Sequence, residues 1–299
     1  MKTESKQLAA LTFCASTVPS ILILPHAGWL WAGIAAVFSV LFALFAQTRP
    51  GIKNRYLLLL LLLWNLIALG AVSDILCAAF PNGGVLLGLL LLLLAAYAAD
   101  RGVYVILRVG AVAVFAVIIL YGMLLGFSLP GLEVKQLVPR KDIAWTLLPA
   151  AMTPMLSILL DKEAAKANKL WLYGIVVLTI LAALVSSGRQ DFYTAMKSVS
   201  VLGAMERLEP LVSVALTIGG FCLLGLICAV NGKLLSEIFQ KRTLALPTNF
   251  FVGGACIWIS SLLSGSILAI GTAIFWGLLP ILPQPLEKQK KFEKKQKNA

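Results

Sequence analysis

Two short segments, each interrupted by proline inside an apolar stretch, carry side chains that could hold a ligand. The first is Ser16-Thr17-Val18-Pro19-Ser20, and the second is Ala150-Ala151-Met152-Thr153-Pro154, preceded by Pro149. Proline has no backbone N–H to donate, so it frees a carbonyl group where it interrupts a helix. In lipid, a freed group is costly unless protein, water or a ligand satisfies it. Paired interruptions of this kind are typical of midplane sites in secondary transporters.

The hydroxyl groups of Ser16, Thr17 and Ser20 could bind a small polar solute at the first interruption. The half-helix that begins there would add unpaired N–H groups and the positive end of a helix dipole, which suit a carboxylate. The competing interpretation is a structural kink whose polar groups are satisfied by neighbouring helices and by the hydroxyls themselves. The matching interruption at 150–154 favours the ligand site.

Three further polar residues lie within apolar stretches. Asn65 is expected at membrane depth, where its amide either contacts the ligand or joins two helices. Asp74 lies farther along the same stretch and could pair with Arg189 or Arg207, or else be an interfacial carboxylate. Arg108 is either a structural or coupling charge inside the protein or a side chain that snorkels to the membrane surface.

No arrangement typical of an enzyme is present. The one histidine and the scattered acidic residues offer no nucleophile with a nearby base, and no glycine-rich phosphate loop is found. Ser213 and Thr217 share a helical face and could bind sodium, but bonding back to the preceding turn explains these hydroxyls as well. We therefore predict no metal and no cofactor. The five cysteines form no CxxC pair and are interpreted as small packing residues.

The composition sets the environment of these residues. The chain has 60% apolar and 13% charged residues, and its mean hydropathy is +0.93. A soluble protein of this size would carry about twice that charge. We predict an all-α polytopic membrane protein with ten membrane spans, at residues 8–24, 27–46, 56–80, 84–99, 103–127, 143–160, 170–186, 211–229, 246–263 and 266–282.

The basic residues predict how these spans are oriented. With both termini in the cytoplasm, 18 of the 25 lysines and arginines fall on the cytoplasmic side, as the positive-inside rule requires. This count needs a turn at Ser260–Ser266, which divides 246–282 into a helical hairpin. The lysine-rich tail 284–299 is typical of a segment that contacts anionic lipid. No folded domain precedes it, so we do not expect nucleic-acid binding.

The odd number of spans in each half predicts an inverted repeat. Residues 1–128 form the first five-helix repeat, 129–142 an extracellular linker, and 143–283 the second repeat. Because five is odd, the second half must enter the membrane from the opposite side. Each half opens with an interrupted helix, so the pattern predicts a 5+5 inverted-repeat, LeuT-like fold with broken helices 1 and 6.

Two stretches resemble the spore germination B-subunit family of the amino acid–polyamine–organocation transporter superfamily. Tyr97-Ala98-Ala99-Asp100-Arg101-Gly102, followed by Arg108, is similar to the junction between the fourth and fifth helices in that family, and Met205-Glu206-Arg207-Leu208-Glu209 is similar to its outer linker. The resemblance implies a cell-membrane or spore inner-membrane protein that senses small germinants together with partner subunits. It also implies that the Arg108 guanidinium stands in a cation site beside the broken first helix.

The expected function is binding of a small solute, in particular an amino acid, as a germinant-sensing subunit of a spore germination receptor. One alternative is an amino acid permease of the same fold. Another is a membrane assembly subunit that binds no ligand. The expected ligand-binding residues are Ser16, Thr17, Val18, Pro19, Ser20, Asn65, Ala150, Ala151, Met152, Thr153 and Pro154, with Arg108 and Asp74 as charges beside the site.

Overall fold

In the part of the chain that the structure describes, all of the regular secondary structure is helical. The computed structural model describes residues 2–22, 29–47, 54–80, 84–128, 174–177, 209–239, 244–262 and 265–279. Within these ranges, four helices are long and apolar enough to cross a membrane: α4, α5, α6 and α12. The predicted class, an all-α membrane protein, is confirmed. The ten-span inverted repeat stays a prediction, because 129–173 and 178–208 lie outside the described residues.

The last four helices of the first half begin and end within two residues of the predicted spans, whereas the first begins at Lys2 rather than at Leu8. The first span is divided into α1 (Lys2–Ala15) and α2 (Thr17–Leu22), and α3 covers Trp29–Gln47. The next three helices are α4 (Arg55–Ala79), α5 (Gly84–Arg101) and α6 (Val103–Ser128). Gly102, which has a positive φ of 130°, is the one residue between α5 and α6. Apolar length alone was therefore sufficient to place these helices.

The second half departs from the prediction in two ways. Helix α12 covers Glu209–Phe239, so it continues well past the predicted end at residue 229. After α13 (Ala245–Pro247), the chain forms a π-helical segment, η5 (Thr248–Val252), before α14 (Gly253–Leu262). A second π-helical segment, η6 (Ala273–Leu278), follows α15 (Gly265–Thr272). Such segments are rare in proteins and are enriched at functional sites.

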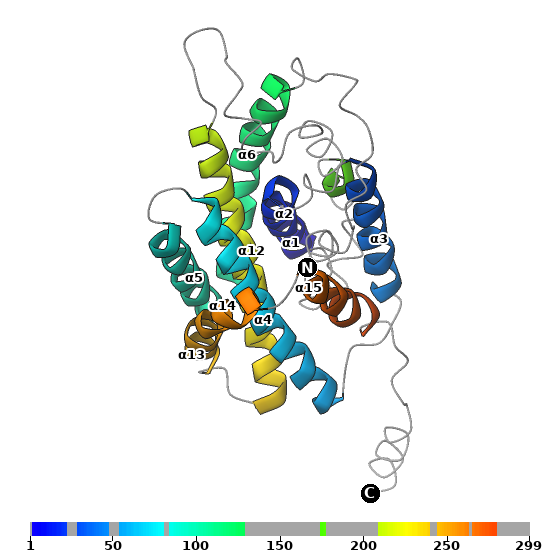
Figure 1. Cartoon of the computed structure of the whole chain (residues 1–299), viewed down its shortest axis with the longest axis vertical. Coiled ribbons are helices and arrows are strands. Elements are labelled where there is room, and N and C mark those ends of the chain that lie inside the picture. The colour runs from blue at the N-terminus through cyan, green and yellow to red at the C-terminus, as the bar shows by residue number, and fades with distance from the viewer. Residues whose placement is uncertain are drawn as a thin grey trace, which may run out of the picture.

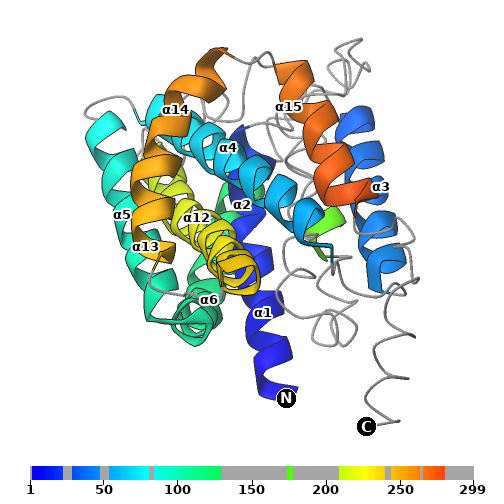
Figure 2. The ribbon, with the colours of Figure 1, turned by 90° about the horizontal axis from the view of Figure 1, so that it is seen from below.

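Helix α12 is the centre of the bundle. It packs against α1, α2, α4, α5 and α6, and Figures 1 and 2 show these helices arranged around it. Its residues 222–231 are all buried, as expected of a helix that is apolar on every side. At its end, the Arg55 guanidinium donates a hydrogen bond of 2.8 Å to the Ile238 carbonyl, where a cation complements the helix dipole.

Helix α4 meets α14 along a backbone-to-backbone contact at Gly70. A Cβ added to Gly70 would lie 2.6 Å from the carbonyl oxygen of Cys256 and 2.7 Å from the amide nitrogen of Ile257. Both atoms belong to the backbone, so a side chain here could not be accommodated by rotation of a neighbouring side chain. The two helices can approach this closely because residue 70 is glycine, as is common at helix contacts in membranes.

The turn predicted at Ser260–Ser266 coincides with the boundary between two described helices. Helix α14 ends at Leu262, and α15 begins at Gly265. Figure 2 shows the two helices running in opposite senses from this point. The described boundaries therefore fit the helical hairpin that the distribution of basic residues requires.

The hairpin predicts on which side of the membrane the carboxyl terminus lies. A cysteine introduced at Lys294 should react with a membrane-impermeant maleimide only when the reagent reaches the cytoplasmic side, because the hairpin returns the chain to that side. Labelling of oriented vesicles before and after permeabilisation measures from which side the introduced cysteine is accessible. The unmodified protein, whose five cysteines lie in or beside apolar stretches, is the control. Labelling from the outside would contradict the hairpin.

Candidate ligand-binding site

The first predicted interruption is present as a one-residue turn at Ser16. The Ser16 amide donates to the Thr12 carbonyl at 3.0 Å, and the Ser20 amide donates to the Ser16 carbonyl at 3.1 Å. The helical path therefore continues through the turn. Pro19 has no N–H, so it cannot donate to the Ala15 carbonyl as a helical residue would. The interruption is thus a short kink between α1 and α2 rather than an unwound segment.

Three hydroxyl groups around the kink donate to their own helix. The Thr12 hydroxyl donates to the Leu8 carbonyl at 2.9 Å, Ser16 donates to the Phe13 carbonyl at 2.7 Å, and Ser20 donates to the Ser16 carbonyl at 2.7 Å. A hydroxyl has one proton and two acceptor lone pairs. Because these protons are used within the helix, the oxygens of Ser16 and Ser20 are suited to accept hydrogen bonds rather than to donate them.

A tyrosine on α6 completes this side of the site. Tyr121 is 2% exposed, and its hydroxyl group has no hydrogen-bond partner within the described residues. The Ser20 side chain is next to it. Buried tyrosine hydroxyls usually have a partner; the Ser20 side chain is close enough to interact with this one, but no hydrogen bond of standard geometry joins the two hydroxyls. Tyr121 was not predicted as a site residue; the signal available in the sequence was a tyrosine far from the polar start of an apolar span.

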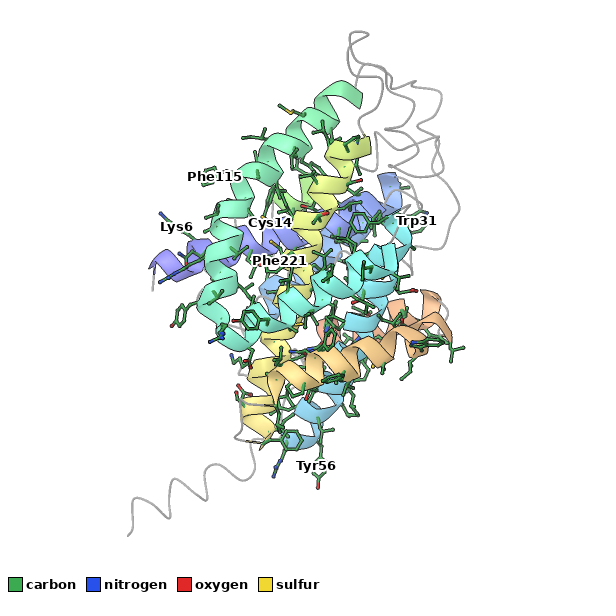
Figure 3. All side chains as sticks on the ribbon, turned by 90° about the vertical axis from the view of Figure 1, so that its left-hand side faces the viewer. Lys6, Cys14, Trp31, Tyr56, Phe115 and Phe221 are labelled. Atoms are coloured by element: carbon green, nitrogen blue, oxygen red, sulfur yellow. The ribbon has the colours of Figure 1, made fainter. Side chains whose placement is uncertain are left out.

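Helix α12 forms the other wall of the site. Thr17 is 3% exposed, and a Cβ added to Gly219 would lie 3.0 Å from the Thr17 Cβ and 3.1 Å from the Cys14 carbonyl oxygen. The Cys14 thiol is 3.8 Å from the Gly110 carbonyl oxygen on α6, and Figure 3 shows Cys14 where α1 crosses α6. The kink is therefore enclosed between α6 and α12, away from the surface.

Asn65 belongs to a different polar contact. Its side chain is 0% exposed, and its Oδ1 accepts a hydrogen bond of 2.6 Å from the Trp276 Nε1 in η6. Its Nδ2 has no partner within the described residues. The ring of Trp64, the preceding residue, stacks on Phe275 at 5.2 Å between centroids. The amide therefore joins α4 to η6, which is the alternative role considered for Asn65.

A hydrogen bond between two buried asparagines was not predicted from the sequence. The Asn231 Nδ2 on α12 donates to the Asn249 Oδ1 in η5 at 2.9 Å, and the Asn249 Nδ2 donates to the Cys228 carbonyl at 3.2 Å. Both asparagines are 0% exposed. Like Asn65 and Trp276, this pair joins a long helix to a π-helical segment. The signal available in the sequence was two asparagines in or beside apolar spans.

The remaining predicted residues lie elsewhere or outside the described residues. Arg108 is exposed on α6, as the snorkelling alternative predicts. Thr217 donates to the Ser213 carbonyl at 2.8 Å, which is the back-bonding alternative to a sodium ligand. Asp74 is partly exposed. Its predicted partners, Arg189 and Arg207, and the second interruption at 149–154 lie outside the described residues.

The described structure defines an all-α membrane protein with a buried kink in its first helix, enclosed by a long central helix and by α6. No protein-family model matches the chain, and no curated protein matches its sequence.

Proposed function

We propose that the protein binds a small zwitterionic solute, in particular an amino acid, beside the kink between α1 and α2. The biological role would be that of a germinant-sensing subunit in a spore germination receptor with partner subunits. The observation that supports binding is the buried Tyr121 hydroxyl, which has no partner within the described residues and lies next to Ser20. A buried donor left unsatisfied costs about 1–3 kcal/mol, and a ligand that accepts its proton would recover that cost.

The chemistry of the kink suits the two ends of a zwitterion. The Tyr121 hydroxyl would donate to the solute's carboxylate. The oxygens of Ser16 and Ser20, whose protons are used within the helix, would accept from its ammonium group. Thr17 and Val18 would line the apolar part of the site against α12, and Ala150–Pro154 would approach from the second repeat. Each contact is stronger in a site from which water is excluded.

The test is a thermal-unfolding screen of the purified full chain against the common amino acids. A ligand that binds the folded state raises the unfolding midpoint by mass action. For the amino acid that gives the largest shift, Tyr121→Phe should weaken binding by about 1–2 kcal/mol, because a ligand hydrogen bond is lost. Thr17→Val should weaken it by a similar amount if that hydroxyl also contacts the ligand.

Two controls make the result specific. Tyr104→Phe removes the same hydroxyl from an exposed position on the same helix, and we expect it to leave affinity unchanged. Without ligand, Tyr121→Phe should be at least as stable as the wild type, because it removes a buried donor that has no hydrogen bond of standard geometry within the described residues. Unchanged affinity in both Tyr121→Phe and Thr17→Val would place the ligand elsewhere.

The two alternatives predict different outcomes. An amino acid permease would carry the bound solute into proteoliposomes, whereas a sensor would bind it without flux. A non-binding assembly subunit would show no shift with any amino acid; the internal hydrogen bonds of Ser16 and Ser20 favour this alternative over the permease. Replacement of sodium by choline tests ion coupling, and a tenfold or larger loss of affinity would indicate a sodium site.

A further inference from the structure

An open groove lies between α5, α6 and α12 on a face of the bundle that does not include the kink. Its volume is about 700 Å³, and its walls are almost entirely apolar, with lining residues that include Leu91, Val112, Ala116, Ile218 and Phe221. Figure 3 shows this side of the molecule, with Phe115 and Phe221 on opposite sides of α6. From Arg108 to Ala116 the α6 wall is about 12 Å long at the rise of an α-helix.

One end of the groove carries a single permanent charge. Arg108 lines the groove and is exposed, and it forms no ion pair within the described residues. It follows Val103, the first residue of α6, by five residues, so it lies about 7.5 Å along the helix axis from that end. An arginine at this depth extends its guanidinium toward the membrane surface.

The surroundings of Arg108 mark the level of the lipid headgroups. Tyr104, one turn earlier on α6, is 61% exposed, and the Arg101 guanidinium lies 4.9 Å from the ring centroid of Tyr97. Tyrosines and arginines concentrate at this level of a membrane. Farther along α6, Val112 and Phe115 are 76% and 70% exposed, so the same helix presents an apolar surface to the hydrocarbon.

We infer that this groove binds one anionic phospholipid, with its phosphate on Arg108 and one acyl chain along α6 toward Ala116. A guanidinium pairs with phosphate through two parallel hydrogen bonds. The apolar walls match an acyl chain, and the charge at one end matches the headgroup. The chain's net charge of +12 further favours anionic over neutral lipid.

The charge also argues against an apolar helix of another protein as the occupant. Such a helix would bury the Arg108 guanidinium without a partner, and an unpaired buried charge is strongly destabilising. A phospholipid satisfies both ends of the groove at once. This inference does not depend on the amino acid site, because none of the groove's lining residues belongs to the kink.

The test uses the purified full chain in detergent, titrated with phosphatidylglycerol or with phosphatidylcholine of the same acyl composition. Phosphatidylglycerol should raise the unfolding midpoint saturably, and phosphatidylcholine should not. Arg108→Gln should raise the half-saturating phosphatidylglycerol concentration about tenfold, because a charge-assisted contact is lost. Arg108→Lys should be intermediate, because an ammonium lacks the planar fork. Inorganic phosphate should produce no shift, which separates the lipid from a free anion.

Two matched controls separate the groove from general surface charge. Arg101→Gln removes an exposed arginine outside the groove, and it should leave the lipid response intact. Ala116→Phe fills the groove without changing charge and should weaken phosphatidylglycerol binding, whereas Gly122→Phe, on an exposed part of α6 outside the groove, should not. Equal stabilisation by both lipids, or an Arg108→Gln response equal to the wild type, would overturn the inference.

Discussion

Replacing Gly70 with alanine should lower the free energy of unfolding by about 3 kcal/mol. The new Cβ would collide with the backbone of Cys256 and Ile257. Only a separation of α4 from α14 can relieve this collision, and separation removes packing along both helices. Alanine has a higher helix propensity than glycine by up to about 1 kcal/mol. The loss in the free energy of unfolding is therefore expected despite this favourable contribution.

The matched control is Gly254→Ala on α14. A Cβ at Gly254 meets no atom within 4 Å, so this substitution should be neutral or slightly stabilising through helix propensity. Chemical or thermal unfolding of both purified variants in the same detergent gives the comparison. Equal stability of the two variants would mean that α4 and α14 are not in backbone contact at Gly70.

Replacing Asn249 with leucine should cost about 1–3 kcal/mol, because it leaves the Asn231 amide and the Cys228 carbonyl without their described partner. These groups are fully buried beside η5, where lipid or water cannot replace the lost hydrogen bonds easily. The unfolding midpoint should therefore fall, and we expect the fall to be similar in detergent and in lipid nanodiscs.

A double-mutant cycle separates the energy of the Asn231–Asn249 hydrogen bond from the effect of changed side-chain packing. Asn231→Leu alone should also destabilise the protein, because the Asn249 carbonyl oxygen then loses its donor. The double variant should be more stable than the sum of the single losses predicts, because no unpaired amide remains in contact with its former partner. Strict additivity would show that the two side chains do not interact.

The long helices could be predicted because length and apolarity are sufficient to identify a membrane helix. The end of α12 could not be predicted in this way. Asn231, Lys233 and Ser236 lower the hydropathy after residue 229, yet the helix continues to Phe239. The Asn231 amide is hydrogen-bonded to Asn249 in η5, and Arg55 of α4, far away in the sequence, satisfies a carbonyl in the last turn. Such compensation depends on contacts that a local window does not contain.

The kink in the first helix could be predicted from the sequence, but the hydrogen bonding around it could not. Pro19 and the hydroxyls around it correctly indicated an interruption in the first helix. The sequence did not reveal that Ser16 and Ser20 donate their protons to their own helix. The direction in which a hydroxyl donates does not change the pattern of residue types along the chain. Tyr121 was missed because it lies about a hundred residues farther along the chain, and only the tertiary fold brings α6 close to Ser20 of α2.

The two π-helical segments have a consequence for any comparison of this chain with its relatives. A π turn holds one residue more than an α turn, so a helical wheel drawn at a constant period through 245–262 or 265–278 assigns the later residues to faces about 100° away from their true ones. An alignment should therefore admit a one-residue gap within Thr248–Val252 and within Ala273–Leu278. A relative that is one residue shorter at either place could keep all the following contacts in register.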